Sequence, residues 1–282
     1  MSTSSIETGS LGFPRMGRHR ELKFAVERFW SGEWTADQLA AAAREIRRSR
    51  WQMQAAAGIH NIPSNDFSLY DHVLDTAVLV GAIPARYRER ADTAALATYF
   101  AMARGTHAVS AMEMTKWFDT NYHYVVPEFT PGMTFRAASR KPIEEVLEAR
   151  ALELPTRPVL LGPVSFVLLG KARNAHLDRS DLAQALVEVY SQVLNELASA
   201  GAAWVQIDEP FLGLDLSASV QLLFNRVYQS LAARGSGLKV MLATYFSELG
   251  ENLDLALRLP VAGLHLDLVR GAGQLSRALK GD

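Results

Sequence analysis

The sequence predicts an α/β fold, a (β/α)8 barrel of the TIM type that is incomplete at its C-terminal end. Apolar strand-like segments alternate with amphipathic helices, which implies parallel strands covered on both faces. Seven strand candidates can be counted, so about seven of the eight β/α units of a closed barrel are expected. Polar residues follow several of these candidates, at the end of the strand where such a barrel builds its site.

The helices are predicted from the spacing of apolar residues and from end signals. Thr35 and Gln38 form a capping box at the start of the first long helix, and Gly58 follows its end. Another long helix is predicted from Asp178 to Ala200 by the spacing of its apolar residues, and Gly201 follows its end. The helical segments are 35–57, 67–80, 178–200, 218–233 and 252–258.

The strands are predicted from short apolar or β-branched runs. The densest is VLLGPVSFVLLG after Pro158, which carries no charge and precedes a helix. The seven candidates are LGFPR near the start, residues 59–63, the MTKWF segment, the run after Pro158, residues 204–208, 239–244, and a strand within 261–269.

Composition limits the class of protein. The chain has 282 residues, 49% of them hydrophobic, which is enough for one large core. Lys and Arg number 29 against 30 Asp and Glu, with the signs mixed, so neither a nucleic-acid partner nor a membrane surface is indicated. No cysteine is present, which excludes disulfides, thiolate zinc sites and cysteine nucleophiles within this chain.

The polar start of the chain lacks the features of a signal peptide, and no apolar run has membrane-spanning length. We therefore expect a cytoplasmic protein. Residues 1–10 are expected to be a disordered tail, and residues 11–282 to form the barrel domain.

The segment GFPRMGRHRELK shapes a loop before a helix. Arg20 and Lys23 are three residues apart in the first helical turn and share a face that could bind carboxylates. A solvated basic turn is the competing interpretation, because most charged clusters face water.

The segment EMTKWFDTNYHYVVPEF combines aromatic residues with Lys116 and His123. Aromatic faces beside a lysine suit a flat heterocycle with an acidic tail. The alternative is that the aromatic side chains belong to the core and that His123 is a structural residue.

The QIDEP segment places Asp208 and Glu209 at the end of a predicted strand. Because side chains alternate along a strand, only one of the two is expected to face the barrel mouth. His265 and Asp267 share a strand face but are too few for a metal site. We therefore assign no metal-binding residue to this chain.

Seven motifs follow one another along the chain: LGFPRMGRHRELK, FSLYDHVL, EMTKWFDTNYHYVVPEF, RPVLLGPVSFVLLGK, WVQIDEP, ATYF and GLHLDLVRG. In this order they resemble the N-terminal domain of cobalamin-independent methionine synthase. The resemblance runs from about Leu11 to Gly271.

This resemblance implies one half of a two-barrel methyltransferase that acts on 5-methyltetrahydropteroyltri-L-glutamate and L-homocysteine in methionine biosynthesis. The family's folate-binding residues match Arg20, Glu21, Leu22, Lys23 and Lys116. The family's zinc, with its His, Glu and Cys ligands, belongs to the C-terminal catalytic barrel, which is the expected partner. No cofactor and no catalytic residue is therefore expected in this chain.

Asp208 and Glu209 have a counterpart in the family's second barrel, so they are expected to be a vestigial site. Two further alternatives stay open from the sequence. One is a truncated fragment without catalytic activity, which is how the chain alone is expected to behave. The other is an independent small barrel enzyme that uses Asp208 together with His123 or His265.

Overall fold

A parallel sheet forms the centre of the molecule in the computed structural model, which describes residues 6–88, 95–172 and 177–280. Its order is β1-β5-β7-β8-β9, and every neighbouring pair is parallel. The strands are β1 (Ile62–Ser64), β5 (Thr156–Leu161), β7 (Trp204–Asp208), β8 (Lys239–Ala243) and β9 (Gly263–His265). The predicted α/β class is confirmed, and the parallel sheet with its helices is that of an incomplete TIM-type barrel.

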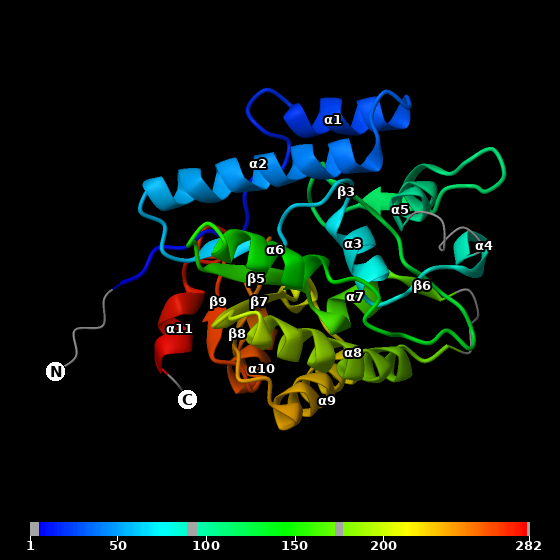
Figure 1. Cartoon of the computed structure of the whole chain (residues 1–282). Coiled ribbons are helices and arrows are strands. Elements are labelled where there is room, and N and C mark those ends of the chain that lie inside the picture. The colour runs from blue at the N-terminus through cyan, green and yellow to red at the C-terminus, as the bar shows by residue number, and fades with distance from the viewer. Residues whose placement is uncertain (1–5, 89–94, 173–176, 281–282) are drawn as a thin grey trace.

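Helices cover the sheet on its outer side, as parallel strands require. α8 (Arg179–Ser199), α9 (Ala218–Arg234) and α10 (Leu253–Arg258) lie below the strands in Figure 1, and α6 (Lys141–Arg150) lies beside β5. Leu160, Val205, Ile207 and Leu242 are at most 2% exposed, so the sheet forms the centre of the main core.

A second layer is built before the main sheet begins. α1 (Glu21–Trp30) and α2 (Ala36–Ala56) pack together at the top of Figure 1. They share a core cluster with α3 (His72–Leu79) and α5 (Ala95–Arg104). Apart from one hairpin, the other elements are α4 (Ala85–Arg88), β4 (Glu128–Phe129), α7 (Pro163–Leu169), β6 (Lys171–Ala172), η1 (Pro210–Gly213), η2 (Gly250–Asn252) and α11 (Gln274–Lys280).

Two of the seven predicted strands are not in the central sheet. Residues 11–15 (LGFPR) form no ladder, and the only nearby pairing is a single bridge between Gly9 and Asn61. The MTKWF segment supplies β2 (Met114–Lys116), which pairs antiparallel with β3 (His123–Val125). The sequence between these strands turns back within a few residues, so β2 finds its hydrogen-bonding partner locally and β1 pairs directly with β5.

Two predicted boundaries were wrong. The helix predicted over 67–80 begins only at His72, because the Asp71 side chain accepts hydrogen bonds from the first free backbone N–H groups. The apolar run after Pro158 is not one strand: β5 ends at Leu161, and Pro163 starts α7. Proline suits the first turn of a helix, because the N–H that it lacks has no partner there.

The other long helices agree with the sequence. α2 has the predicted capping box, in which Gln38 N–H donates to Thr35 Oγ1 and Thr35 N–H donates to Gln38 Oε1. Asp178 caps α8 through Ser180 N–H.

The predicted disordered tail, residues 1–10, is only partly covered by the structure, since residues 1–5 lie outside the described part. Thr8 accepts backbone hydrogen bonds from His60 and Asn61, and Ser10 Oγ donates to Gln54 at 2.6 Å. Residues 8–10 therefore contact the barrel, and ordered structure begins before the predicted boundary at residue 11.

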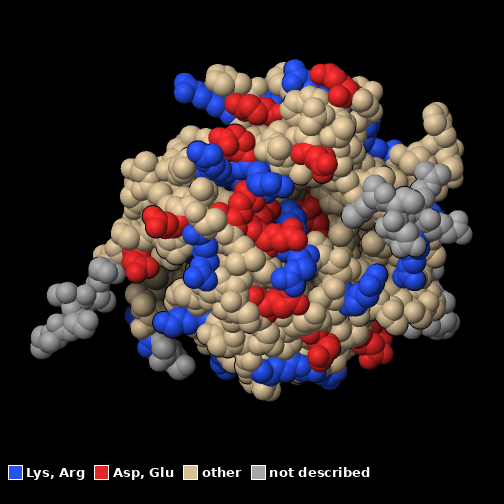
Figure 2. Space-filling view, viewed as in Figure 1, with Lys and Arg blue, Asp and Glu red and all other residues tan. Residues whose placement is uncertain are grey.

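Charges of both signs are interspersed on the face shown in Figure 2, in keeping with a net charge of −1. Arg47 of α2 and Glu148 of α6 form an ion pair at 2.6 Å. This pair links the layer of α1 and α2 to the helices that cover the central sheet. In the described residues, no helix is both long and apolar enough to cross a bilayer.

Candidate functional site

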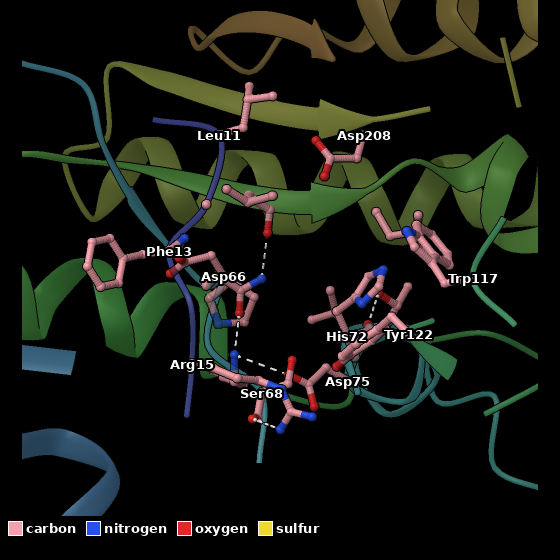
Figure 3. Close-up of a pocket in the computed structure, with 18 of the residues that line it drawn as sticks. Leu11, Phe13, Arg15, Asp66, Ser68, His72, Asp75, Trp117, Tyr122 and Asp208 are labelled. Atoms are coloured by element: carbon pink, nitrogen blue, oxygen red, sulfur yellow. Dashed lines mark hydrogen bonds and ion pairs between the residues drawn. The ribbon is translucent and has the colours of Figure 1, made fainter. Parts of the chain in front are cut away.

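A cavity of about 440 Å³ opens at the C-terminal ends of the central strands, and we call it the barrel-mouth cavity. Asn65 follows β1, Leu161 ends β5, Asp208 ends β7 and Tyr245 follows β8, and all four line it. Figure 3 shows this cavity, with Asp208 on one side and Arg15 and Ser68 on the opposite side. Strand ends thus build the cavity where the barrel fold predicts a site.

Asp208 is the acidic residue of QIDEP that faces the barrel mouth. Its Oδ1 accepts from Gln206 Nε2 at 2.7 Å, and its Oδ2 accepts from the Tyr245 hydroxyl at 3.1 Å. Arg157 in turn donates to Gln206 Oε1 at 2.8 Å, which holds the amide in place. Removal from water raises the pKa of Asp208 to about 7, although these hydrogen bonds oppose the rise.

Glu209 points to the opposite face of the sheet, as the alternation of strand side chains predicted. It is fully buried and accepts from the backbone N–H groups of Val164 and Ser165 at the start of α7 and from the Tyr228 hydroxyl. Burial raises its pKa to about 7. Glu209 therefore fixes α7 against the sheet and does not reach the cavity.

Two of the cavity's carboxylates are paired internally. Asp66 accepts from Arg50 at 2.8 Å. Lys141 lies 3.3 Å from Asp75 and 3.1 Å from Glu145. Among the described residues, Arg15 and Asp208 line the same cavity without an ion-pair partner. Arg15 instead donates to the Ser68 backbone carbonyl at 3.0 Å and lies over the Tyr122 ring.

Aromatic side chains form one wall of the cavity, visible in Figure 3 as Trp117, His72 and Tyr122. The His72 and Trp117 rings meet edge to face with centroids 4.4 Å apart. Removal from water lowers the pKa of His72 to about 4, so this imidazole is neutral at neutral pH.

A second cavity of about 390 Å³ lies between α1 and the β2–β3 hairpin, and we call it the α1–hairpin cavity. Lys23 and Leu22 line it from α1, and Met114 and His123 line it from the hairpin. Arg15 and Tyr122 line both cavities, so these two side chains form the wall between them.

Residues 7–281 match the family model described as cobalamin-independent synthase, N-terminal domain. The chain belongs to the cobalamin-independent synthase family. This confirms the resemblance found in the sequence.

Curated relatives in this family are much longer than the chain. It is 52% identical to the 5-methyltetrahydropteroyltriglutamate–homocysteine methyltransferase of Caulobacter vibrioides, over 98% of the chain and 38% of the relative. The enzyme of the same name from Chelativorans sp. is 55% identical over 98% of the chain and 37% of the relative. The chain thus spans less than two fifths of these relatives.

Solved structures agree in fold. The chain is similar to a putative vitamin-B12 independent methionine synthase from Listeria monocytogenes, with a TM-score of 0.62 and 13% identity over 92% of this chain and 71% of that one. It is also similar to a methyltransferase from Methanosarcina mazei, with a TM-score of 0.56 and 14% identity. That match covers 99% of this chain and 76% of the other one. At such identities the likeness concerns the fold alone.

The five residues that the cobalamin-independent synthase family suggested do not all reach a cavity. Leu22 is buried, and Lys23 lines the α1–hairpin cavity. Arg20 is the exposed N-cap of α1 with a left-handed φ of 63°, and Glu21 accepts from the backbone N–H of His19 at 3.0 Å. Lys116 is exposed on β2, where it pairs in register with His123.

The structure does not bring together the residues of an independent barrel enzyme. Asp208 lines the barrel-mouth cavity, whereas His123 lines the α1–hairpin cavity. His265 lies on β9 with its Nδ1 2.9 Å from the Thr244 carbonyl oxygen. Within the described residues, no cluster of three or more His, Asp or Glu side chains could hold a metal ion.

Two residues that the sequence did not single out matter for the geometry around the two cavities. Arg15 lies in the loop before the RELK segment and lines both cavities. Asp71 ties the start of α3 to the hairpin, because it also accepts from Val125 N–H at 2.9 Å. An Asp directly before a helical apolar pattern is an N-cap signal, so Asp71 could have been found from the sequence.

Proposed function

We propose that this chain is the folate-binding part of a 5-methyltetrahydropteroyltriglutamate–homocysteine methyltransferase, and that the α1–hairpin cavity receives the polyglutamate tail. One observation carries the proposal. Leu22 and Lys23 of the RELK segment and Met114 of the MTKW segment, about ninety residues apart in the sequence, line opposite walls of one cavity.

The register of the hairpin supports a role for Lys116. Residues opposite each other in an antiparallel pair share a face, and so do residues two apart on one strand. Lys116 pairs with His123 and is two residues from Met114, and both of these line the cavity. Its side chain therefore belongs to the hairpin face that borders the cavity.

The charges near this cavity suit a chain of carboxylates. Lys23 is 42% exposed and lies 3.6 Å from Glu27 within α1, so an incoming carboxylate competes with a weak surface pair. Arg20 and Lys116 are exposed at the rim. Each contact in such an open site contributes only about 0.2–1 kcal/mol, and several contacts are needed for useful affinity.

The rest of the reaction falls to a partner in this proposal. A zinc ion that holds homocysteine as a thiolate would keep the sulfur deprotonated at neutral pH. This chain has no cysteine to contribute to a thiolate ligand set. We propose that a C-terminal catalytic barrel supplies the zinc and docks on the domain formed by residues 11–282, in the cytoplasm.

Calorimetry with the triglutamate and monoglutamate forms of methyltetrahydrofolate tests the tail assignment. We expect tighter binding of the triglutamate and a loss of affinity with added salt, because the contacts are exposed ion pairs. Lys23→Ala and Lys116→Ala should each weaken the triglutamate by up to about fivefold.

Lys280→Ala is the matched control, because Lys280 is an exposed lysine of α11 and does not line the cavity. It should leave the affinity unchanged. Equal and salt-independent binding of the two folate forms would refute the assignment.

A further inference from the structure

We propose that Arg15 binds a carboxylate of the polyglutamate tail from the side of the α1–hairpin cavity, and that it contributes more to recognition of the tail than the lysines do. This inference rests on the proposed function and adds to it a residue outside the RELK and MTKW segments. Arg15 lines the α1–hairpin cavity together with Lys23, and it also lines the barrel-mouth cavity.

The charge left over in the α1–hairpin cavity is positive. With histidine counted as neutral, three charged side chains line this cavity in the described part of the chain, Lys23, Glu27 and Arg15. Lys23 and Glu27 lie 3.6 Å apart and compensate each other. Arg15 has no ion-pair partner among the described residues, so the cavity favours an anionic group, and each glutamate of the tail carries a carboxylate.

The two sides of Arg15 differ in charge, and this difference determines from which side an anion approaches. The barrel-mouth cavity is lined by three acidic and two basic side chains of the described residues, namely Asp66, Asp75, Asp208, Arg15 and Lys141. The α1–hairpin cavity is lined by one acidic side chain, Glu27, and two basic ones. Because like charges repel, a carboxylate meets less repulsion on the α1–hairpin side.

The Arg15 guanidinium is held in place before a ligand binds. Its Nη1 donates to the Ser68 carbonyl at 3.0 Å, and its Cζ lies 5.7 Å from the centroid of the Tyr122 ring (Figure 3). Arginine has five N–H donors, so the bond to Ser68 leaves donors for a carboxylate. A guanidinium fixed in this way loses little freedom when it forms a forked pair with a carboxylate.

The loop that carries Arg15 is tied down on both sides of it. Phe13 N–H donates to the Asp66 carboxylate at 2.7 Å. The Met16 carbonyl accepts from Leu22 N–H of α1 at 3.2 Å. These bonds fix the position of Arg15 relative to α1, which forms one wall of the cavity.

Arg15 should contribute more to tail binding than the lysines for two reasons. Lys23 must give up Glu27 to bind a carboxylate, and Lys116 is exposed to water on β2. Arg15 is half-buried and has no partner to give up among the described residues. Leu22 lines the same cavity, so a carboxylate at Arg15 lies beside apolar surface and is less screened by water.

Calorimetry of the full chain with two probes tests the role of Arg15. One probe is the triglutamate form of methyltetrahydrofolate, and the other is the same molecule with every carboxylate converted to an amide. Arg15→Gln should weaken the triglutamate by at least about tenfold and leave binding of the amide form unchanged. Arg15→Lys keeps the charge but not the fork, so it should weaken the triglutamate less than Arg15→Gln does.

Arg18→Gln is the matched control, because Arg18 is an exposed arginine of the same loop and lines neither cavity. It should leave the affinity for the triglutamate unchanged. If Arg15→Gln weakened both probes equally, its role would be structural and the inference would be wrong. A wild-type chain that prefers the triglutamate while Arg15→Gln binds it equally well overturns this inference alone, whereas a wild-type chain without that preference overturns the proposed function as well.

Discussion

Replacing Asp71 with Ala removes the side chain that joins α3 to the β2–β3 hairpin. Asp71 is 1% exposed. Its oxygens accept from Val73 N–H at 3.1 Å and Leu74 N–H at 2.9 Å, which caps α3, and from Val125 N–H at 2.9 Å, which holds β3. Alanine leaves all three buried donors without this acceptor.

The expected cost is the sum of two effects. Loss of a helix N-cap costs about 1 kcal/mol, and a buried N–H left without a partner costs about 1–3 kcal/mol. The free energy of unfolding should therefore fall by about 2–4 kcal/mol. At roughly 2 °C per kcal/mol for a chain of this size, the melting temperature should fall by about 4–8 °C.

Urea unfolding and thermal melts measure this loss. Asp178→Ala is the matched control, because Asp178 also caps a helix but is exposed and, among the described residues, accepts from one N–H. It should cost no more than about 1 kcal/mol. If Asp71→Ala were no more destabilising than Asp178→Ala, the contact from α3 to the hairpin would contribute nothing and the reasoning would be wrong.

Two more predictions concern Glu209 and its surroundings. A methyl group at Gly162 would lie 2.1 Å from the Glu209 carboxyl carbon, so Gly162→Ala should lower the free energy of unfolding by about 1–3 kcal/mol. Gly273→Ala is the control: a methyl group there meets no atom within 4 Å, and this substitution should not lower the free energy of unfolding. Burial raises the pKa of Glu209 from an ordinary 4.5 to about 7. Between these two pH values the folded chain keeps a proton on Glu209 that the unfolded chain has lost. Stability should therefore fall as pH rises through the window, and Glu209→Gln should flatten that slope by up to about 1.4 kcal/mol per pH unit in urea unfolding; an unchanged slope would show that this carboxyl does not titrate as described.

Features of the fold that depend on neighbours in the chain could be predicted from the sequence. The capping box of Thr35 and Gln38 starts α2, and Asp178 starts α8, because capping joins groups only two or three residues apart. The alternation of side chains along a strand correctly predicted that Asp208 and Glu209 point to opposite faces of the sheet. The family could also be named from motifs alone.

Only the tertiary structure decided which distant groups meet. The antiparallel pairing of β2 with β3, the contact from Asp71 to Val125 across 54 residues, and the shared wall of Arg15 and Tyr122 have no periodic signal in the sequence. The same holds for the two charges that stay unpaired in the barrel-mouth cavity. Local patterns report a residue's own helix or strand, whereas ion pairs, buried donors and cavities depend on side chains that folding brings together from separate elements.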